Sequence, residues 1–250
     1  MKTSILSLAM ASLLSGCVVY VGNGHARDLQ HEERKLALSA TELQQLVADT
    51  GAGKLEIIGE TGRDSIELVA NIYYYDAEDI RLSLSQRRSD AVLEAGFATA
   101  FYNGNSPYID LLVKVPAHFS LTLEDGSGDT EVRGLSGDLN IDDGSGELRV
   151  SGGNNASIKD GSGDVYISQL SGNLLLEDGS GDADIRHIKG NISIEDGSGD
   201  LNISVVGGIV TIDDGSGDLS VDGAGGLTII ESGSGGLKLN AINGPVQIDD

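Results

Sequence analysis

In the second half of the chain, apolar and polar residues alternate, and the alternation returns at a fixed interval. Each unit has a glycine-rich turn, with aliphatic side chains two and four residues after its second glycine. The first of these columns holds Thr130, Leu148, Val165, Ala183, Leu201, Leu219 and Leu237, and the second holds Val132, Val150, Ile167, Ile185, Ile203, Val221 and Leu239. Polar residues such as Glu131 and Arg149 lie between the columns. An apolar period of two predicts short strands with one buried face.

The turns repeat a short acidic motif. DGSGD begins at Asp125, Asp160, Asp178, Asp196 and Asp214, DGSGE begins at Asp143, and a degenerate SGSGG begins at Ser232. These starts are 18, 17, 18, 18, 18 and 18 residues apart. Each interval contains a second apolar half, with Leu139, Leu174, Ile192 and Val210 in one column and Ile141, Ile158, Leu176, Ile194, Ile212, Ile230 and Ile248 in the other.

An interval of 18 residues that holds two strands and two turns predicts one coil of a β-solenoid. Stacked coils place equivalent residues about 4.8 Å apart and pair neighbouring strands in parallel. One coil buries too few aliphatic side chains to offset its ordering entropy, so only a stack is stable. We therefore expect an all-β, single-chain parallel β-solenoid, right-handed, with an interior filled by its own Leu, Ile and Val and no internal ligand cavity.

The N-terminus has the features of a targeting segment. An apolar run from Ile5 to Leu14 is too short to span a bilayer and leads into Leu14-Ser15-Gly16-Cys17. This stretch resembles the bacterial lipobox, which implies cleavage before Cys17 and lipidation of that residue. An ordinary signal peptide with an incidental cysteine is the alternative. Cys17 is the only cysteine, so no internal disulfide competes for its thiol. By resemblance to Gram-negative lipoproteins, Val18 after the cysteine favours the outer membrane if the source is Gram-negative.

We divide the chain into four segments. Residues 1–16 are a lipoprotein signal peptide, 17–49 a tether and cap, 50–118 an irregular start of the solenoid, and 119–250 the regular repeat. The irregular segment holds most of the aromatic residues, in Tyr73-Tyr74-Tyr75 and in FATAFYNGNSPY. This excursion is either a packed cap or a recognition loop for a glycan or an envelope protein. The residues that we expect in such a contact are Tyr73, Tyr75, Phe101, Tyr102 and Tyr108.

Charge and motif content exclude several functions. The formal net charge of −23 excludes ordinary nucleic-acid binding, which needs a basic surface. The repeated serines do not stand in a G-x-S-x-G elbow before a helix, and the four histidines do not recur with them. No GK[ST] follows the glycine-rich turns, which excludes a P-loop. We therefore expect no enzymatic activity and no bound cofactor other than a cation.

The motif acids are candidate cation ligands, and two interpretations stay open. The acids are Asp125, Asp129, Asp143, Asp160, Asp164, Asp178, Asp182, Asp196, Asp200, Asp214 and Asp218. In one interpretation the stacked carboxylates bind calcium or another divalent cation weakly. In the other they serve the turn: the first Asp shares the parity of the buried aliphatics and accepts N–H groups of the following Gly-Ser-Gly, while the second faces water. The calcium-binding β-roll places its Asp two residues after the second glycine, where this chain has aliphatic residues.

The stretch DLLVKVP, followed by AHFSLTLEDGSGD and repeated units of the type GSGDLNI, resembles a bacterial family of β-strand-repeat proteins described as candidate adhesins. The resemblance covers roughly residues 50–250. It implies a β-helical fold and, because many such proteins are exported or lipid-anchored, a place in the cell envelope.

Three functional hypotheses follow. The first is a non-enzymatic, lipid-anchored cell-envelope solenoid, attached to the membrane through its lipid, that acts as an adhesin or envelope scaffold. The second is a calcium-responsive binding module, and the third an exported glycan-active enzyme. The chain stops in PVQIDD after a strand pattern, so we also expect the C-terminal coil to pair with a second copy or a partner.

Overall fold

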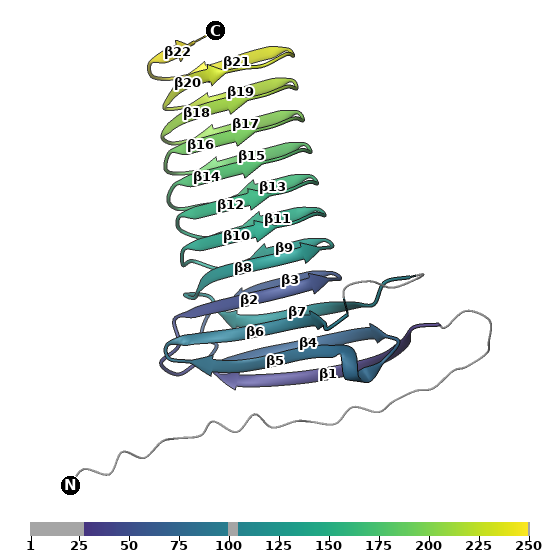
Figure 1. Cartoon of the computed structure of the whole chain (residues 1–250). Helices are drawn as coiled ribbons and strands as arrows, with labels where there is room; N and C mark the ends of the chain where they lie inside the picture. Colours follow the sequence, from purple (N-terminus) through teal and green to yellow (C-terminus); the bar gives the residue numbers. More distant parts are fainter. Residues whose placement is uncertain (1–27, 100–104, 250) are drawn as a thin grey trace.

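The computed structural model describes residues 28–99 and 105–249. These residues form two eleven-stranded sheets that face each other along a tall stack (Figure 1). The first sheet has the order β1-β4-β7-β3-β9-β11-β13-β15-β17-β19-β21, and the second has the order β22-β20-β18-β16-β14-β12-β10-β8-β2-β6-β5. Ten spacings of about 4.8 Å make the stack about 48 Å tall. The predicted parallel β-solenoid is confirmed.

The strands of the irregular part are β1 (Gln30–Ser39), β2 (Gln45–Ala52), β3 (Leu55–Glu60), β4 (Ser65–Tyr74), β5 (Ile80–Arg87), β6 (Asp90–Phe97) and β7 (Tyr108–Pro116), with one short 3-10 helix at Ala77–Asp79. The strands of the regular part are β8 (Ser120–Ser127), β9 (Thr130–Arg133), β10 (Leu139–Asp143), β11 (Leu148–Ser151), β12 (Ala156–Asp160), β13 (Val165–Ser168), β14 (Leu174–Asp178), β15 (Ala183–Ile188), β16 (Ile192–Asp196), β17 (Leu201–Val206), β18 (Ile209–Asp214), β19 (Leu219–Ala224), β20 (Gly226–Glu231), β21 (Leu237–Ile242) and β22 (Val246–Ile248). Within the described ranges, no helix has the length and apolar character needed to cross a membrane.

Each regular coil contributes one strand to each sheet. The strand that follows the DGSGD turn joins the first sheet, and the strand that precedes the next DGSGD joins the second. Neighbouring coils pair in parallel and in register; Leu148, for example, lies opposite Thr130 on one side and Val165 on the other. This register gives every motif position a column of equivalent residues along the stack.

The interior consists of the aliphatic columns that the alternation predicts. Leu148, Leu201 and Ile212 are among the side chains without measurable exposure. The prediction for Ile230 is wrong, because this side chain is half exposed and Ile229 occupies the buried place opposite Ile212. The register shifts after Ile212, because a bulge in β20 adds one residue that points outward.

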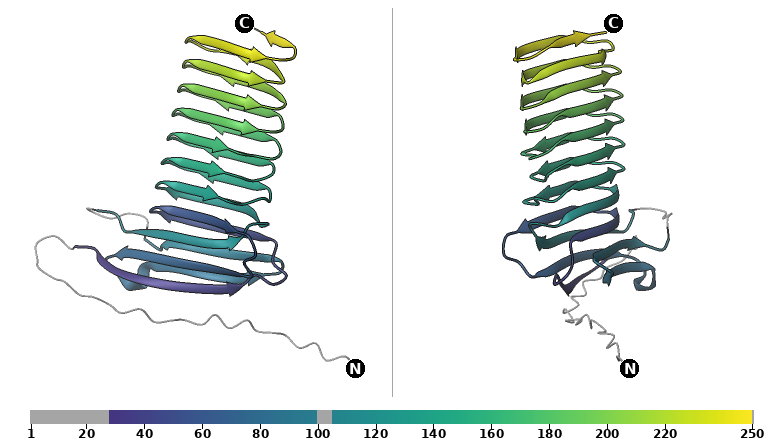
Figure 2. Two further views of the ribbon diagram at one scale, coloured as in Figure 1. Left: turned by 180° about the vertical axis from the view of Figure 1, so that it is seen from behind. Right: turned by 90° about the vertical axis from the view of Figure 1, so that its left-hand side faces the viewer.

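The base of the stack departs from parallel order. The coil made of β2 and β3 lies between the coil of β6 and β7 and the regular coil of β8 and β9. Below it, β1 and β4 are antiparallel additions to the first sheet, and β5 is an antiparallel addition to the second (Figure 2). Antiparallel strands thus end the stack at the base, and β22 lies at the opposite end (Figure 1).

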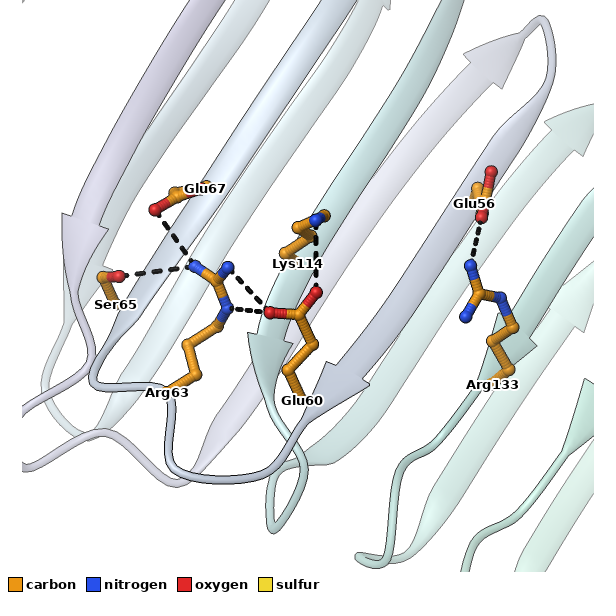
Figure 3. A network of polar contacts seen from close by, with 7 residues as sticks. All are labelled: Glu56, Glu60, Arg63, Ser65, Glu67, Lys114 and Arg133. Atoms are coloured by element: carbon orange, nitrogen blue, oxygen red, sulfur yellow. Dashed lines mark hydrogen bonds and ion pairs between the residues drawn. The ribbon is translucent and has the colours of Figure 1, made fainter.

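Ion pairs link the base strands on the outer face of the first sheet. The guanidinium of Arg63 donates to Glu60 at 2.8 Å and contacts Glu67 at 3.1 Å, and the ammonium of Lys114 lies 3.2 Å from the other oxygen of Glu60 (Figure 3). Arg133 of β9 reaches Glu56 of β3 at 2.7 Å and so links the regular coils to the base.

Candidate functional site

The Gly-Ser-Gly turns require glycine for a steric reason. The second glycine of the motif has a positive φ in each complete copy, for example 139° at Gly163. A Cβ at Gly163 would also overlap the carbonyl oxygen of Gly146 in the neighbouring coil. The turns therefore stack backbone on backbone, and this close stacking fixes the acids on either side of each turn.

The first acid of each motif is buried, as its parity predicts. We call these residues the inner column: Asp125, Asp143, Asp160, Asp178, Asp196 and Asp214. Their exposed fractions lie between 0% and 6%. Consecutive members lie opposite each other in the parallel pairing of the second sheet. Six carboxyl groups therefore form one continuous line inside the solenoid.

Most oxygens of the inner column have no hydrogen-bond partner. Both carboxyl oxygens of Asp143, Asp160 and Asp214 are unpartnered. We expected the turn N–H groups to satisfy them, and at Asp160 that prediction is wrong. At Asp143 and Asp214 the N–H groups of Ser145 and Ser216 lie near enough to oppose the rise in pKa but do not complete a hydrogen bond. The first glycine of each turn donates instead to a backbone carbonyl of the adjacent coil, as Gly161 does to Asp143 at 2.9 Å. The parallel ladder thus uses N–H groups that an isolated turn would offer to its aspartate.

Two members of the inner column do have partners. The backbone N–H of Ser180 donates to Asp178 Oδ1 at 3.1 Å. At the base end, Thr50 stands opposite Asp125 and donates its hydroxyl to Oδ1, while the hydroxyl of Thr130 lies 3.4 Å from Oδ2. A hydroxyl donor therefore ends the column where it meets the base.

Burial shifts the acid–base behaviour of the whole column. Desolvation, with the neighbouring charges of Asp178 and Asp143 as a smaller cause, raises the pKa of Asp160 to about 7. The pKa of Asp196 rises to about 7 and that of Asp178 to about 6, in both cases mainly by desolvation. These groups therefore take up or release protons near neutral pH, where ordinary aspartates are fully ionised.

The second acid of each motif forms a different structure, the turn column of Asp129, Glu147, Asp164, Asp182, Asp200 and Asp218. These residues are exposed, except that Glu147 is half-buried. The aspartates are not simply solvated: each accepts the backbone N–H of the equivalent residue one coil further on, as at Asp182 Oδ1 and Asp200 N, 2.9 Å apart. The same contact recurs from Asp129 to Gly236. Glu147 is the exception in this series of hydrogen bonds, because its longer side chain pairs with Arg149 at 2.5 Å instead.

A second ladder of the same kind, which the sequence analysis missed, lies at the opposite turn. Asn155 Oδ1 accepts the N–H of Asn173 at 3.0 Å, Asn173 Oδ1 that of Asn191 at 2.8 Å, and Asn191 Oδ1 that of Ile209 at 2.9 Å. Asp138 begins this series by accepting from Asn155. The recurrent Asn or Asp before the second apolar half of each coil is the sequence signal that identifies it.

The structure also shows an exposed acidic line that sequence analysis missed. The residue before each motif points outward from the second sheet, and the register joins Glu94, Asp49, Glu124, Asp142, Lys159, Glu177, Glu195, Asp213 and Glu231. We call this the ridge column. A shallow groove of about 520 Å³ runs beside it, and its lining includes Glu177, Glu195 and the inner-column residues Asp160, Asp178 and Asp196. The sequence signal for this column is the acidic residue that directly precedes DGSG in most copies of the motif.

The predicted metal ligands therefore lie in two separate columns on either side of the turn. Within the described residues, no three His, Cys, Asp or Glu side chains come together as a set of metal ligands. Cation binding by the stacked carboxylates stays a prediction.

The aromatic residues of the base pack against one another. Tyr73 lies between His31 and Tyr108, with ring centroids 4.6 and 4.4 Å away, so both faces of its ring are covered. The hydroxyl of Tyr75 donates to the carbonyl of Asn105 at 2.9 Å. Phe101 and Tyr102, like Cys17, lie outside the described residues. A partner contact at these aromatic residues stays a prediction, and for Tyr73 only the ring edge is open to one.

The last described coil exposes side chains that point inward in earlier coils. Leu237, Val246 and Ile248 have exposed fractions of 43%, 50% and 42%. Pairing of this coil with a second copy stays a prediction.

Comparison with known proteins identifies a family. The family described as Toastrack DUF4097 matches residues 30–241. No curated protein matches the chain. Among solved structures, the chain is similar to a candidate cell adhesion protein from Clostridium sporogenes, with 14% identity over 88% of this chain and 99% of that one and a TM-score of 0.31. A candidate adhesin from Parabacteroides distasonis has 14% identity over 88% of this chain and 97% of that one, with a TM-score of 0.45. A candidate adhesin from Bacteroides fragilis has 14% identity over 88% of this chain and 97% of that one, with a TM-score of 0.31.

Proposed function

This chain belongs to the Toastrack DUF4097 family, and from that premise we propose that it is a non-enzymatic, exported, lipid-anchored solenoid of the cell envelope that acts as an adhesin or an envelope scaffold. The observation that carries the proposal is the continuous interior. Its two facing sheets are filled by their own aliphatic side chains, so the available chemistry lies on long outer faces rather than in an enclosed catalytic cavity.

The direction of the stack supports the same function. The first described strand lies in the base, and the regular coils extend away from it to the far end of a stack that is about 48 Å tall in all (Figure 1). A lipid on Cys17 would tether the base end, and the regular coils would then present their faces at a distance from the membrane. Such an arrangement suits contact with a glycan or another envelope protein.

Fractionation of cells that express the full chain tests the anchor. We expect the protein in the membrane fraction, labelled by a palmitate analogue, and we expect Cys17→Ser to release it without the label. Wild-type protein in the soluble fraction would contradict lipid anchoring. Attachment of cells to host or abiotic surfaces, with and without the gene, tests adhesion separately, and an unchanged envelope integrity together with unchanged attachment would contradict both roles.

A second candidate function is a calcium-responsive binding module. The observation that favours it is the inner column, in which Asp143, Asp160 and Asp214 are buried with both oxygens unpartnered. Buried oxygens without donors are suitable partners for a cation, and the ridge column would attract cations to the same edge. Thermal unfolding with and without calcium tests this candidate.

A further inference from the structure

A groove of about 490 Å³ lies on the outer face of the first sheet, across β9, β11, β13 and β15. Its floor is built by outward side chains of two neighbouring columns. The parallel register places Glu131, Arg149, Tyr166 and Asp184 in one column and Arg133, Ser151, Ser168 and Arg186 in the other. Three strand spacings of about 4.8 Å separate the first and last residues of each column, so the floor is about 14 Å long.

Positive and negative charges nearly balance in this groove. It contains all three arginines of residues 119–250, in a chain of net charge −23. Each arginine has an acidic partner: Arg133 contacts Glu56 at 2.7 Å (Figure 3), Arg149 contacts Glu147 at 2.5 Å, and Arg186 contacts Asp184 at 2.8 Å. The groove therefore offers strong donors and strong acceptors together.

This balance selects among classes of ligand. A polyanion is repelled by the overall charge and finds the groove arginines already paired. A polycation is attracted instead to the ridge column on the other sheet, where eight acids and one lysine share a line. A neutral ligand rich in hydroxyl groups fits best, because each hydroxyl both donates and accepts hydrogen bonds.

The groove also holds an aromatic ring. Tyr166 is the only aromatic residue after Phe119. The guanidinium carbon of Arg149 lies 3.9 Å from the centre of its ring and so covers one face of it, and Asp184 occupies the next position of the column on the other side. Aromatic rings provide apolar surface with a polar tip, which suits the apolar face of a sugar ring. The hydroxyls of Ser151 and Ser168 and the amide of Gln169 line the same groove.

We infer that the groove formed by Arg133, Arg149, Tyr166 and Arg186 binds a neutral glycan chain lying across the strands of the first sheet. Sugar hydroxyls would bridge the acid–arginine pairs, and one sugar ring would pack beside Tyr166. The inference rests on the proposed function in one respect, because it names the ligand class of an adhesive surface.

The test uses the purified full chain without its lipid and a fixed set of probes: cellohexaose, maltohexaose, an N-acetylglucosamine hexamer and hexagalacturonate. Calorimetric titration measures affinity at two salt concentrations. We expect saturable binding of a neutral hexasaccharide that changes little with salt, since no net charge is paired on binding. Tyr166→Ala and Arg186→Ala should each weaken it at least tenfold.

Lys159→Ala and Leu175→Ala, on the outer face of the second sheet, are the matched controls and should bind as the wild type does. Circular dichroism and melting temperature establish that each variant is folded. Three results would overturn the inference: no saturable binding of any neutral probe, binding of hexagalacturonate alone, or equal weakening by the groove and control variants. Membrane fractionation of Cys17→Ser does not depend on this groove, so failure here leaves the proposed function to its own test.

Discussion

Asp143 and Asp160 lie opposite each other on adjacent rungs of the inner column, both almost completely buried, and neither carboxyl group has a hydrogen-bond partner. Two ionised carboxylates at such a spacing repel each other, and each also loses its hydration. The protonated forms avoid both costs. The column therefore makes the stability of the solenoid depend on pH.

We predict that the solenoid is more stable in mild acid than in mild base. Burial raises the pKa of Asp160 from 3.8 to about 7, so between these values the folded state binds more protons than the unfolded state. The free energy of unfolding then falls as pH rises through this window, and the full stabilisation is present below the unfolded pKa. Denaturant unfolding at pH 5 and pH 8 should differ by at least about 2 kcal/mol. Equal stability at the two values would contradict the buried column.

A neutral substitution in the column should remove part of this dependence. Asp160→Asn keeps the shape of the side chain but cannot ionise, so we expect it to raise stability at pH 8 and to flatten the pH profile. The charges that face Asp160 are those of Asp143 and Asp178, and the variant removes the repulsion between them and an ionised Asp160. Asp164→Asn, across the same turn but exposed, is the control. If both variants changed the profile equally, net charge rather than burial would be the cause.

The turn column should contribute stability through single hydrogen bonds. Asp182→Ala leaves the N–H of Asp200 without its acceptor, which is 2.9 Å away in the folded chain, and we expect a loss of about 1 kcal/mol. Asp182→Asn retains an acceptor oxygen and should be near neutral. Asp142→Ala removes an equal charge from the ridge column and should not destabilise the protein. Urea unfolding of the three variants at one pH would separate the hydrogen bond from the charge.

The stacking of the turns predicts that the stability lost on replacing a glycine by alanine depends strongly on where that glycine lies. Gly163→Ala requires a φ of 139° from alanine and places its Cβ against the carbonyl of Gly146, so we expect a loss of at least about 2 kcal/mol. Gly96→Ala, where a Cβ meets nothing within 4 Å, is the control and should change stability little. Comparable losses in both variants would contradict the close contact between turns.

The sequence predicts the features that depend on neighbouring residues of the chain better than those that depend on contacts between coils. Alternation and the fixed interval predict the coil, its buried columns and the inward position of Asp160, because these follow from local strand parity. They do not predict which donor satisfies that carboxyl. In an isolated turn the N–H of Gly161 could donate to the Asp160 carboxyl group. In the stack it donates to the backbone carbonyl of Asp143 in the neighbouring coil. Likewise, the coils of the base do not stack in the order of the chain, since β2 and β3 lie between β6 and β7 and the regular coils. The local pattern of residues does not predict this order.

The last prediction concerns calcium and follows from the same column. Above pH 7 the inner column loses protons, and a bound cation would offset the repulsion between neighbours such as Asp178 and Asp196, which lie on adjacent rungs. We therefore expect millimolar calcium to raise the melting temperature at pH 8, where the carboxylates are ionised, and to have little effect at pH 5, where protons occupy the same oxygens. Magnesium at equal ionic strength is the control for screening, because calcium accepts the irregular oxygen geometry of a carboxylate stack more readily. Asp196→Asn should reduce the calcium effect. Melting curves that superimpose at pH 8 with calcium and with chelator would contradict cation binding and leave protonation as the only means by which the column is neutralised.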